Sequence, residues 1–160
     1  MLNITLICVG KMREVHYISA FAEYEKRLTP YCKFEHIELA EAKLPLSPSP
    51  AEIDAGLKKE FADIIRHIPN GAILIAMCIE GTELSSKELA DFFQKCANKG
   101  KSRLCFVVGS SFGLDDDIKR RADLRLSMSK MTFPHHLARV MLAEQIYRGI
   151  MINEGSKYHK

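Results

Sequence analysis

The chain has 160 residues, 47% of them hydrophobic and 27% charged, which suits one domain with a sizeable core and is short for two. Its formal net charge of +3 permits an anionic partner without demanding one. No apolar run is long enough to span a bilayer, and the first residues lack the basic start and cleavage site of a signal peptide, so we expect no membrane segment.

The first half of the chain alternates strand and helix patterns. Asn3–Gly10 is a short apolar run rich in β-branched residues, which predicts a strand, and apolar spacing predicts a helix over Tyr17–Leu28. Lys33–Leu39 alternates apolar and polar residues, as a strand with one wetter face does. The proline-rich stretch Lys43–Glu52 favours an exposed loop. Apolar residues at Ile53, Leu57, Phe61 and Ile64 then predict a helix over Ala51–Ile68.

The second half repeats a strand, loop and helix three times. The predicted strands are Ala72–Ile79, Leu104–Val108 and Leu124–Ser127. The predicted helices are Lys87–Ala97, Ile118–Ala122 and Leu137–Ile152. Two of these strands are nearly unbroken apolar runs, the pattern of strands covered on both faces. We therefore expect a single α/β domain, residues 1–160, with a largely parallel sheet. Its ligand should bind at the carboxyl ends of the strands.

Several common sites are not supported by the sequence. It contains no P-loop, GxGxxG, GxSxG or HExxH motif, and the adjacent His135 and His136 diverge by about 100° on a helix, so we expect no metal. Five cysteines, an odd number without CxxC spacing, favour buried free thiols over disulfides or zinc and indicate a cytoplasmic protein. In "GSSFG", Gly109 and Gly113 permit either close approach to a ligand or a structural turn.

The stretch Ser127–Gly149 carries the strongest functional signal. A loop of small polar residues and methionines precedes a helix that opens at Pro134, so its free backbone groups could bind a base edge between the apolar side chains of Met128, Met131 and Phe133. The helix is apolar almost all round and must be covered on more than one side, for which a second subunit is a natural cover. Its arginines and glutamate indicate either a site or a structural salt bridge.

The segments "AMCIEGTELSS", "CFVVGSSFGL" and "LSMSKMTFPHHLARVMLAEQIYRG", with the final "YHK", resemble the RlmH family of SPOUT methyltransferases over essentially the whole chain. These enzymes methylate N3 of a pseudouridine in 23S ribosomal RNA with S-adenosylmethionine. The resemblance implies a SPOUT-type sheet with helices on both faces, a C-terminal deep trefoil knot and a homodimer through the last helix. Because the sequence shows no separate RNA-binding domain, we expect the assembled ribosome, rather than free RNA, to present the substrate.

The resemblance also assigns site residues. The implied cofactor contacts are Met77, Gly109, Met128, Ser129, Lys130, Met131, Thr132 and Phe133. The implied catalytic neighbourhood contains His135, Arg148, Tyr158 and His159, whose individual roles stay open. The family often has Leu-Asp where this chain has Met77-Cys78, and a double glycine where it has Gly109-Ser110.

Other interpretations remain at this point. The tail from Asn153 to Lys160 is also typical of a frayed terminus, although an aromatic ring beside a histidine and a lysine suits nucleic acid. A SPOUT methyltransferase with another RNA target is one alternative function. A non-catalytic α/β module that binds a nucleotide or a protein is the other.

Overall fold

The computed structural model describes residues 1–160 as one α/β domain with five strands and five helices. The strands are β1 (Leu2–Val9), β2 (Cys32–Leu39), β3 (Ile73–Glu83), β4 (Arg103–Val108) and β5 (Leu124–Ser127). The helices are α1 (Val15–Leu28), α2 (Pro50–His67), α3 (Ser86–Asn98), α4 (Asp116–Arg121) and α5 (His135–Asn153). Every predicted element is present.

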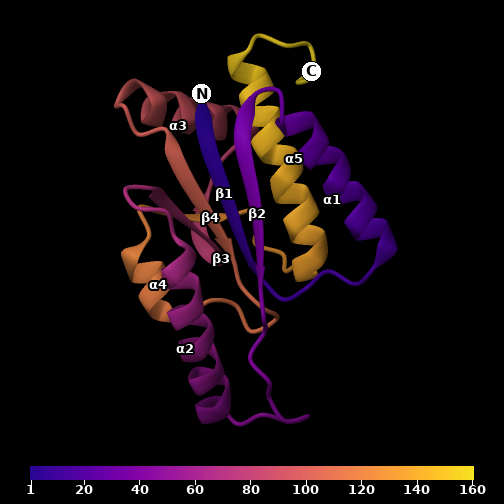
Figure 1. Ribbon diagram of the computed structural model, residues 1–160, viewed down its shortest axis with the longest axis vertical. Helices are drawn as coiled ribbons and strands as arrows, with labels where there is room; N and C mark the ends of the chain where they lie inside the picture. The colour runs from indigo at the N-terminus through magenta and orange to yellow at the C-terminus, as the bar shows by residue number, and fades with distance from the viewer.

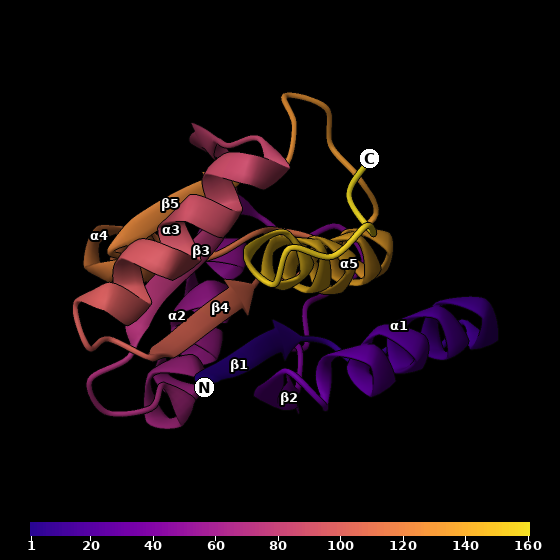
Figure 2. The same ribbon diagram turned by 90° about the horizontal axis from the view of Figure 1, so that it is seen from above.

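The strands form one sheet in the order β2-β1-β4-β3-β5, and every pair is parallel. Helices α1, α3 and α5 cover one face, with α5 between the other two, and α2 and α4 cover the opposite face (Figure 1, Figure 2). The prediction of a parallel α/β sheet with helices on both faces is thereby confirmed. None of the helices combines the length and apolar character needed to cross a membrane.

Strand β3 is longer than predicted. The sequence indicated a loop after Ile79, but the strand continues to Glu83 and pairs with β5 a second time after a register shift between Met77 and Thr82. Gly81 makes this possible, because a Cβ there would lie 2.8 Å from the backbone of Arg125. Glycine at such a bulge permits the close approach of two backbones.

Local capping explains where two of the helices begin. The Ser49 hydroxyl accepts a hydrogen bond from the Glu52 amide and the Glu52 carboxylate accepts one from the Ser49 amide, with Pro50 in the first turn of α2. Ser85 and Glu88 form the same reciprocal pair at the start of α3. These capping boxes satisfy amides that the helix leaves free and so fix both starts.

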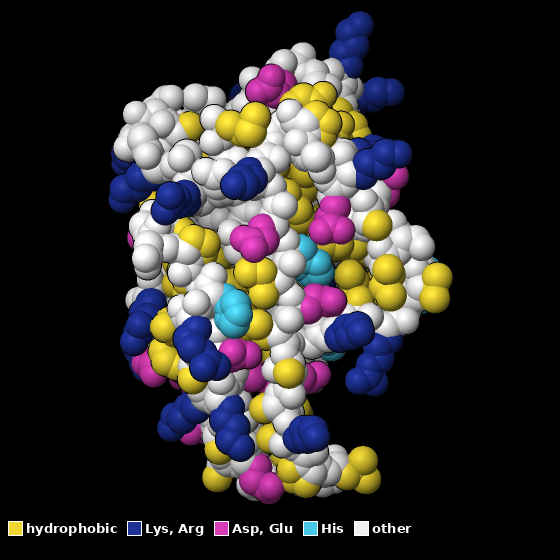
Figure 3. All heavy atoms as spheres, viewed as in Figure 1, with side chains coloured by type: hydrophobic (Ala, Val, Ile, Leu, Met, Phe, Trp, Pro, Cys, Tyr) yellow, Lys and Arg dark blue, Asp and Glu magenta, His cyan; other side chains and the backbone are white.

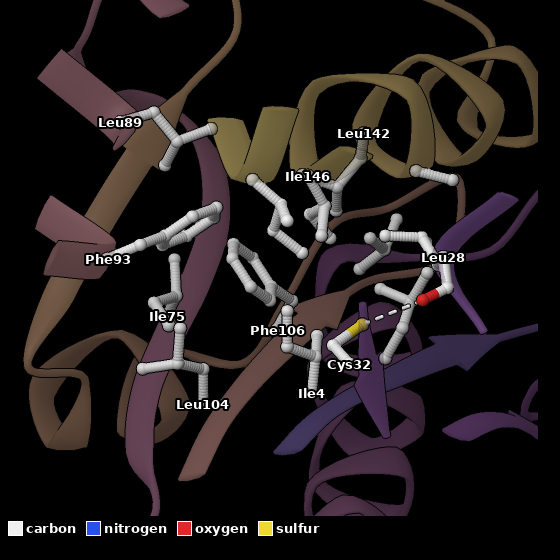
Figure 4. Close-up of a cluster of buried hydrophobic side chains, with 14 of the residues drawn as sticks. Ile4, Leu28, Cys32, Ile75, Leu89, Phe93, Leu104, Phe106, Leu142 and Ile146 are labelled. Carbon is white, nitrogen blue, oxygen red and sulfur yellow. Dashed lines mark hydrogen bonds between the residues drawn. The ribbon is translucent and has the colours of Figure 1, made fainter. Parts of the chain in front are cut away.

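The larger hydrophobic core lies between the sheet and the helices α1, α3 and α5. Figure 4 shows Phe93 of α3 and Phe106 of β4 in this core, with Ile146 of α5 pointing into it. The two phenyl rings meet edge to face at 6.3 Å. A Cβ at Gly149 would lie 2.9 Å from the Phe93 ring, so glycine lets α5 pack closely against α3.

Helix α5 has no exposed face. Every residue from His135 to Ile152 is buried or half-buried even in the single chain. Ile146 is fully buried in the core, whereas Met141 and Tyr147 are only partly covered. The prediction that α5 has no solvent-exposed face is confirmed. Part of the reason is that α5 is the central helix of its layer (Figure 2).

Candidate active site

A cavity of about 430 Å³ lies at the carboxyl ends of β3, β4 and β5. Its walls are the middle of β3 at the register shift after Met77, the loops that follow β4 and β5, and the first three turns of α5. All of the predicted cofactor contacts except Lys130 line it: Met77, Gly109, Met128, Ser129, Met131, Thr132 and Phe133. The volume is that of a site for a small organic ligand.

The cavity is largely apolar, with hydroxyl and backbone groups on two of its sides. The loop after β5 is preformed, because Ser127 donates to the Ser129 carbonyl at 3.0 Å and the Ser129 hydroxyl accepts from the Met131 amide at 3.0 Å. The Cys78 thiol stands on the wall where the resembling family often has aspartate. Burial is the main reason why the pKa of this thiol is raised.

Gly109 is required by the loop after β4 itself. A Cβ at this position would lie 2.5 Å from the carbonyl carbon of Gly113, because the loop folds back on itself. Gly113 has φ of 85°, a conformation that other residues rarely adopt. Both glycines therefore shape this wall of the cavity, and the turn itself accounts for the need for glycine at both positions.

Glu60 of α2 holds this loop from behind, a role that the sequence did not reveal. Its carboxylate accepts hydrogen bonds from the Ser110 hydroxyl at 3.1 Å and from the Ala42 amide at 2.8 Å. The side chain is buried, which raises its pKa. The β4 loop and the loop after β2 are thus joined through one buried carboxylate.

His135 begins α5 and lines the mouth of the cavity. Its pKa is lowered, chiefly by burial and then by the adjacent His136, so its imidazole is neutral at pH 7. The His136 ring lies 4.2 Å from that of His135, centroid to centroid, does not line the cavity and pairs with Glu14 at 2.8 Å. His135 is the one predicted catalytic residue that faces the cavity.

The other predicted catalytic residues gather near the far end of α5. Arg148 pairs with Glu144 at 2.5 Å, and the Tyr158 hydroxyl donates to the same carboxylate at 3.0 Å. The Arg148 guanidinium lies 4.8 Å from the Tyr158 ring centroid and 3.4 Å from Nδ1 of His159. Thirteen residues of helix place Arg148 about 20 Å from His135 along the axis. One chain does not bring all four together.

The tail is not a frayed end. Tyr158 folds back onto α5 and meets Tyr147 edge to face at 4.9 Å. Burial and the hydrogen bond to Glu144 raise the pKa of Tyr158 to about 12. The phenol therefore stays protonated at neutral pH and remains a hydrogen-bond donor.

Arg139 is the arginine of α5 whose role the sequence left undecided. Its side chain is fully buried, pairs with Glu38 of β2 at 2.7 Å and donates to the Gly10 carbonyl at 2.9 Å. This is a structural ion pair that ties the start of α5 to the ends of β1 and β2. Arg139 does not line the cavity.

Comparison with known proteins adds independent information. A family model described as "Predicted SPOUT methyltransferase" matches residues 2–159. The chain is 45% identical over 159 residues to the ribosomal RNA large subunit methyltransferase H of Clostridioides difficile (strain 630), covering 99% of this chain and 100% of that one. Proteins of the same name from Bacillus pumilus (strain SAFR-032) and Clostridium kluyveri (strain NBRC 12016) are 45% and 42% identical, with the same coverage.

Two solved structures share the fold. A probable methylase family protein from Haemophilus influenzae Rd KW20 has a TM-score of 0.54 and 12% identity, over 99% of this chain and 71% of that one. A putative methylase family protein from Neisseria gonorrhoeae has a TM-score of 0.54 and 14% identity, over 91% of this chain and 82% of that one. At such identities the likeness concerns the fold alone.

Proposed function

The chain belongs to the SPOUT methyltransferase family, and we propose that it methylates N3 of a pseudouridine in 23S ribosomal RNA on the assembled ribosome. The observation that carries the proposal is the cavity, which lies where the family resemblance put the cofactor contacts. The names of the relatives, which are similar over their whole length, support the ribosomal target.

The cavity fits S-adenosylmethionine, the methyl donor of this family. Its volume of about 430 Å³ suits a nucleoside with an aliphatic arm. Met128, Met131 and Phe133 supply apolar surface, and the turns at Gly109–Gly113 and Ser129–Thr132 supply backbone donors and acceptors. When bound, the cofactor supplies an electrophilic methyl group on a sulfonium. The protein must hold the acceptor nitrogen in line with it and exclude water.

We propose that His135 is the general base that accepts the N3 proton of the target pseudouridine. Methyl transfer would form a bond from N3 to the methyl carbon while the bond from that carbon to the donor sulfur breaks and a thioether leaves, and the proton on N3 must be accepted by another group. The imidazole of His135 is neutral, because its pKa is lowered, and it stands at the mouth of the cavity. It can therefore accept the N3 proton, the role of a general base. Tyr158 stays protonated and is suited to donating a hydrogen bond to the base.

We further propose that the active form is a homodimer through α5. Arg148, Tyr158 and His159 are far from His135 in one chain, but a two-fold axis across α5 would pair the two copies of the helix antiparallel. The tail of one copy would then stand beside the cavity of the other. A groove lined by Tyr24, Met141 and Glu144 runs along the outer side of α5 and is available for this contact.

The trefoil knot is part of the same proposal. It rests on membership of the SPOUT family. Pulling the two ends of single molecules in denaturant tests it. A knotted chain should extend to less than its full contour length, whereas an unknotted chain should reach it.

The function itself is tested by incubating the purified protein with ribosomes that lack the modification and with labelled S-adenosylmethionine, followed by nucleoside mapping of the 23S RNA. We expect one methyl group at N3 of one pseudouridine. Label at another nucleotide would show that the target is a different one, while the methyltransferase activity of the family would still hold. If the protein neither binds the cofactor at millimolar concentration nor incorporates label, the result would favour a non-catalytic binding module.

A further inference from the structure

The loop between β1 and α1 is anchored to β2. It contains Gly10–Glu14 and has no regular secondary structure. The Gly10 amide donates to the Leu39 carbonyl at 2.7 Å, and the Met12 amide donates to the Glu38 carboxylate at 2.8 Å. The Met12 side chain is buried in the core. These contacts fix the middle of the loop.

The same loop is also anchored to the first two turns of α5. The buried Arg139 guanidinium donates to the Gly10 carbonyl at 2.9 Å, and Glu14 pairs with His136 at 2.8 Å. A Cβ at Gly10 would lie 3.9 Å from Nε2 of His135. The loop therefore stands directly behind the histidine that lines the mouth of the cavity.

Two cations project from this anchored loop. Met12 points inward, so the residues on either side of it, Lys11 and Arg13, are exposed. Neither side chain takes part in an ion pair. The carboxylates of Glu14 and Glu38 are occupied by His136 and Arg139. The Glu41 carboxylate would lie 3.6 Å from a Cβ at Gly10 and pairs with no cation, Lys11 and Arg13 included; it accepts a hydrogen bond from the Ser111 hydroxyl. A fixed backbone with two free cations is suited to binding anions in one place.

The other basic residues do not form such a surface. Figure 3 shows the Lys and Arg side chains in several small groups over this face of the molecule, without one large basic patch. The two arginines of α5 near the site are already paired, Arg139 with Glu38 and Arg148 with Glu144. Lys130, in the loop after β5, is exposed and takes part in no ion pair, but it stands alone there. The position of the unpaired cations Lys11 and Arg13 therefore indicates where an anionic strand could bind, whereas the net charge of the chain does not.

We propose that Lys11 and Arg13 bind backbone phosphates of the RNA strand that carries the target nucleotide. The proposal rests on the proposed function and adds to it the place where the strand runs. Phosphate contacts set the position of a nucleic acid on a protein without reading its sequence. A strand held at this loop would pass the mouth of the cavity at His135, so its target base could enter.

The test compares the double variant Lys11→Gln/Arg13→Gln with the control Lys99→Gln/Lys101→Gln. The control removes the same charge from exposed residues in the loop before β4, at the opposite end of the strands. Three quantities are measured: methylation of ribosomes at several salt concentrations, binding of a single-stranded oligouridylate, and the Kd of S-adenosylmethionine.

For the loop variant we expect kcat/KM on ribosomes to fall about tenfold, as the loss of two phosphate contacts implies. The slope of log kcat/KM against log salt should become shallower by roughly 1.4, or about 0.7 for each single-stranded phosphate contact. Oligouridylate binding should weaken, and kcat at saturating ribosomes and the cofactor Kd should stay within about twofold, as both side chains lie outside the cavity. The control should match the wild type.

An unchanged salt slope, or a slope equal to that of the control, would overturn the proposal. Weaker action on ribosomes with unchanged oligouridylate binding would also overturn it, and would indicate an acidic protein surface as the partner. Loss of cofactor affinity would place the loop in the donor site instead. If the wild-type protein methylates no ribosomes, the oligouridylate titration still decides whether the loop binds RNA, separately from the proposed function.

Discussion

His135 is the residue on which the proposed chemistry depends. Replacing it with Asn should lower kcat by about 10²–10⁴-fold, the usual contribution of a general base, while cofactor binding persists. Because its pKa is lowered below the ordinary 6.5, wild-type activity should stay level through neutral pH and fall only under more acidic conditions, as the imidazole becomes protonated. A pH–rate profile on ribosomes measures this. His67→Asn, at the exposed end of α2, is the control.

Glu60 offers a test of stability at a single carboxyl group. Glu60→Ala removes two hydrogen bonds from a buried group and should lower the free energy of unfolding by roughly 2–4 kcal/mol. Glu60→Gln can keep both, because its amide can donate to the Ser110 hydroxyl and its oxygen can accept from the Ala42 amide.

The free energy of unfolding should depend on pH differently in the wild-type protein and in Glu60→Gln. The folded-state pKa of Glu60 is raised by burial, so its protonated form is the one that the fold favours. Stability from this group is present below the unfolded pKa and is lost as the pH rises through the folded one. The stability of Glu60→Gln relative to wild type should therefore increase from acidic to neutral pH in urea denaturation. A constant difference would show that Glu60 is not held in this environment.

At the scale of elements, the loop after β4 should tolerate no side chain at Gly109. Gly109→Ala places a Cβ against the Gly113 carbonyl group and should displace this wall of the cavity, so calorimetry should show cofactor affinity at least tenfold weaker. Gly100→Ala is the control. It also replaces a loop glycine, one whose φ is positive, but its Cβ would meet nothing within 4 Å. Equal affinities for the two variants would remove Gly109 from the site.

The helices and strands followed from the sequence because hydrophobic periodicity and capping signals act locally. Ser49 and Ser85 mark the starts of α2 and α3 through contacts within four residues. The extension of β3 depends on a glycine that meets a strand more than forty residues later, which no local pattern records. The helical spacing of Ile53, Leu57, Phe61 and Ile64 predicted α2 correctly, but it did not identify the residues that are fully buried, which are Gly56, Glu60 and Ile64.

The site was predicted in part for the same reason. Residues of one loop, such as Met128 and Phe133, are neighbours in the chain and stay neighbours in the cavity. Glu60 reaches the cavity loop from fifty residues away, and Glu38 reaches Arg139 from a hundred and one. A buried glutamate interrupts the apolar pattern of its helix, so no periodic signal marks its position as buried. Its role appears only once the topology brings α2 behind the loop.

At the scale of the whole molecule, the outer side of α5 should carry the dimer. Met141 lies in the groove on that side and is half-buried in the single chain, so Met141→Glu should give a folded monomer in sedimentation. Ile146→Glu would not test the interface, because Ile146 is fully buried in the core of its own chain. Leu46→Glu, at a fully exposed loop position, is the control and should stay dimeric. A dimeric Met141→Glu protein would place the interface elsewhere.

The central claim is that one rRNA methyltransferase site is built from the cavity of one copy and the tail of another. Subunit mixing tests it with His135→Asn and with a chain that ends at Lys157, each of which should be inactive alone. A mixed dimer contains one site with both His135 and the tail intact. Random mixing in equal amounts should therefore restore roughly a quarter of wild-type methylation of ribosomes. If each site lies within one chain, no subunit in the mixture is complete, and the activity would stay at the level of the separate variants.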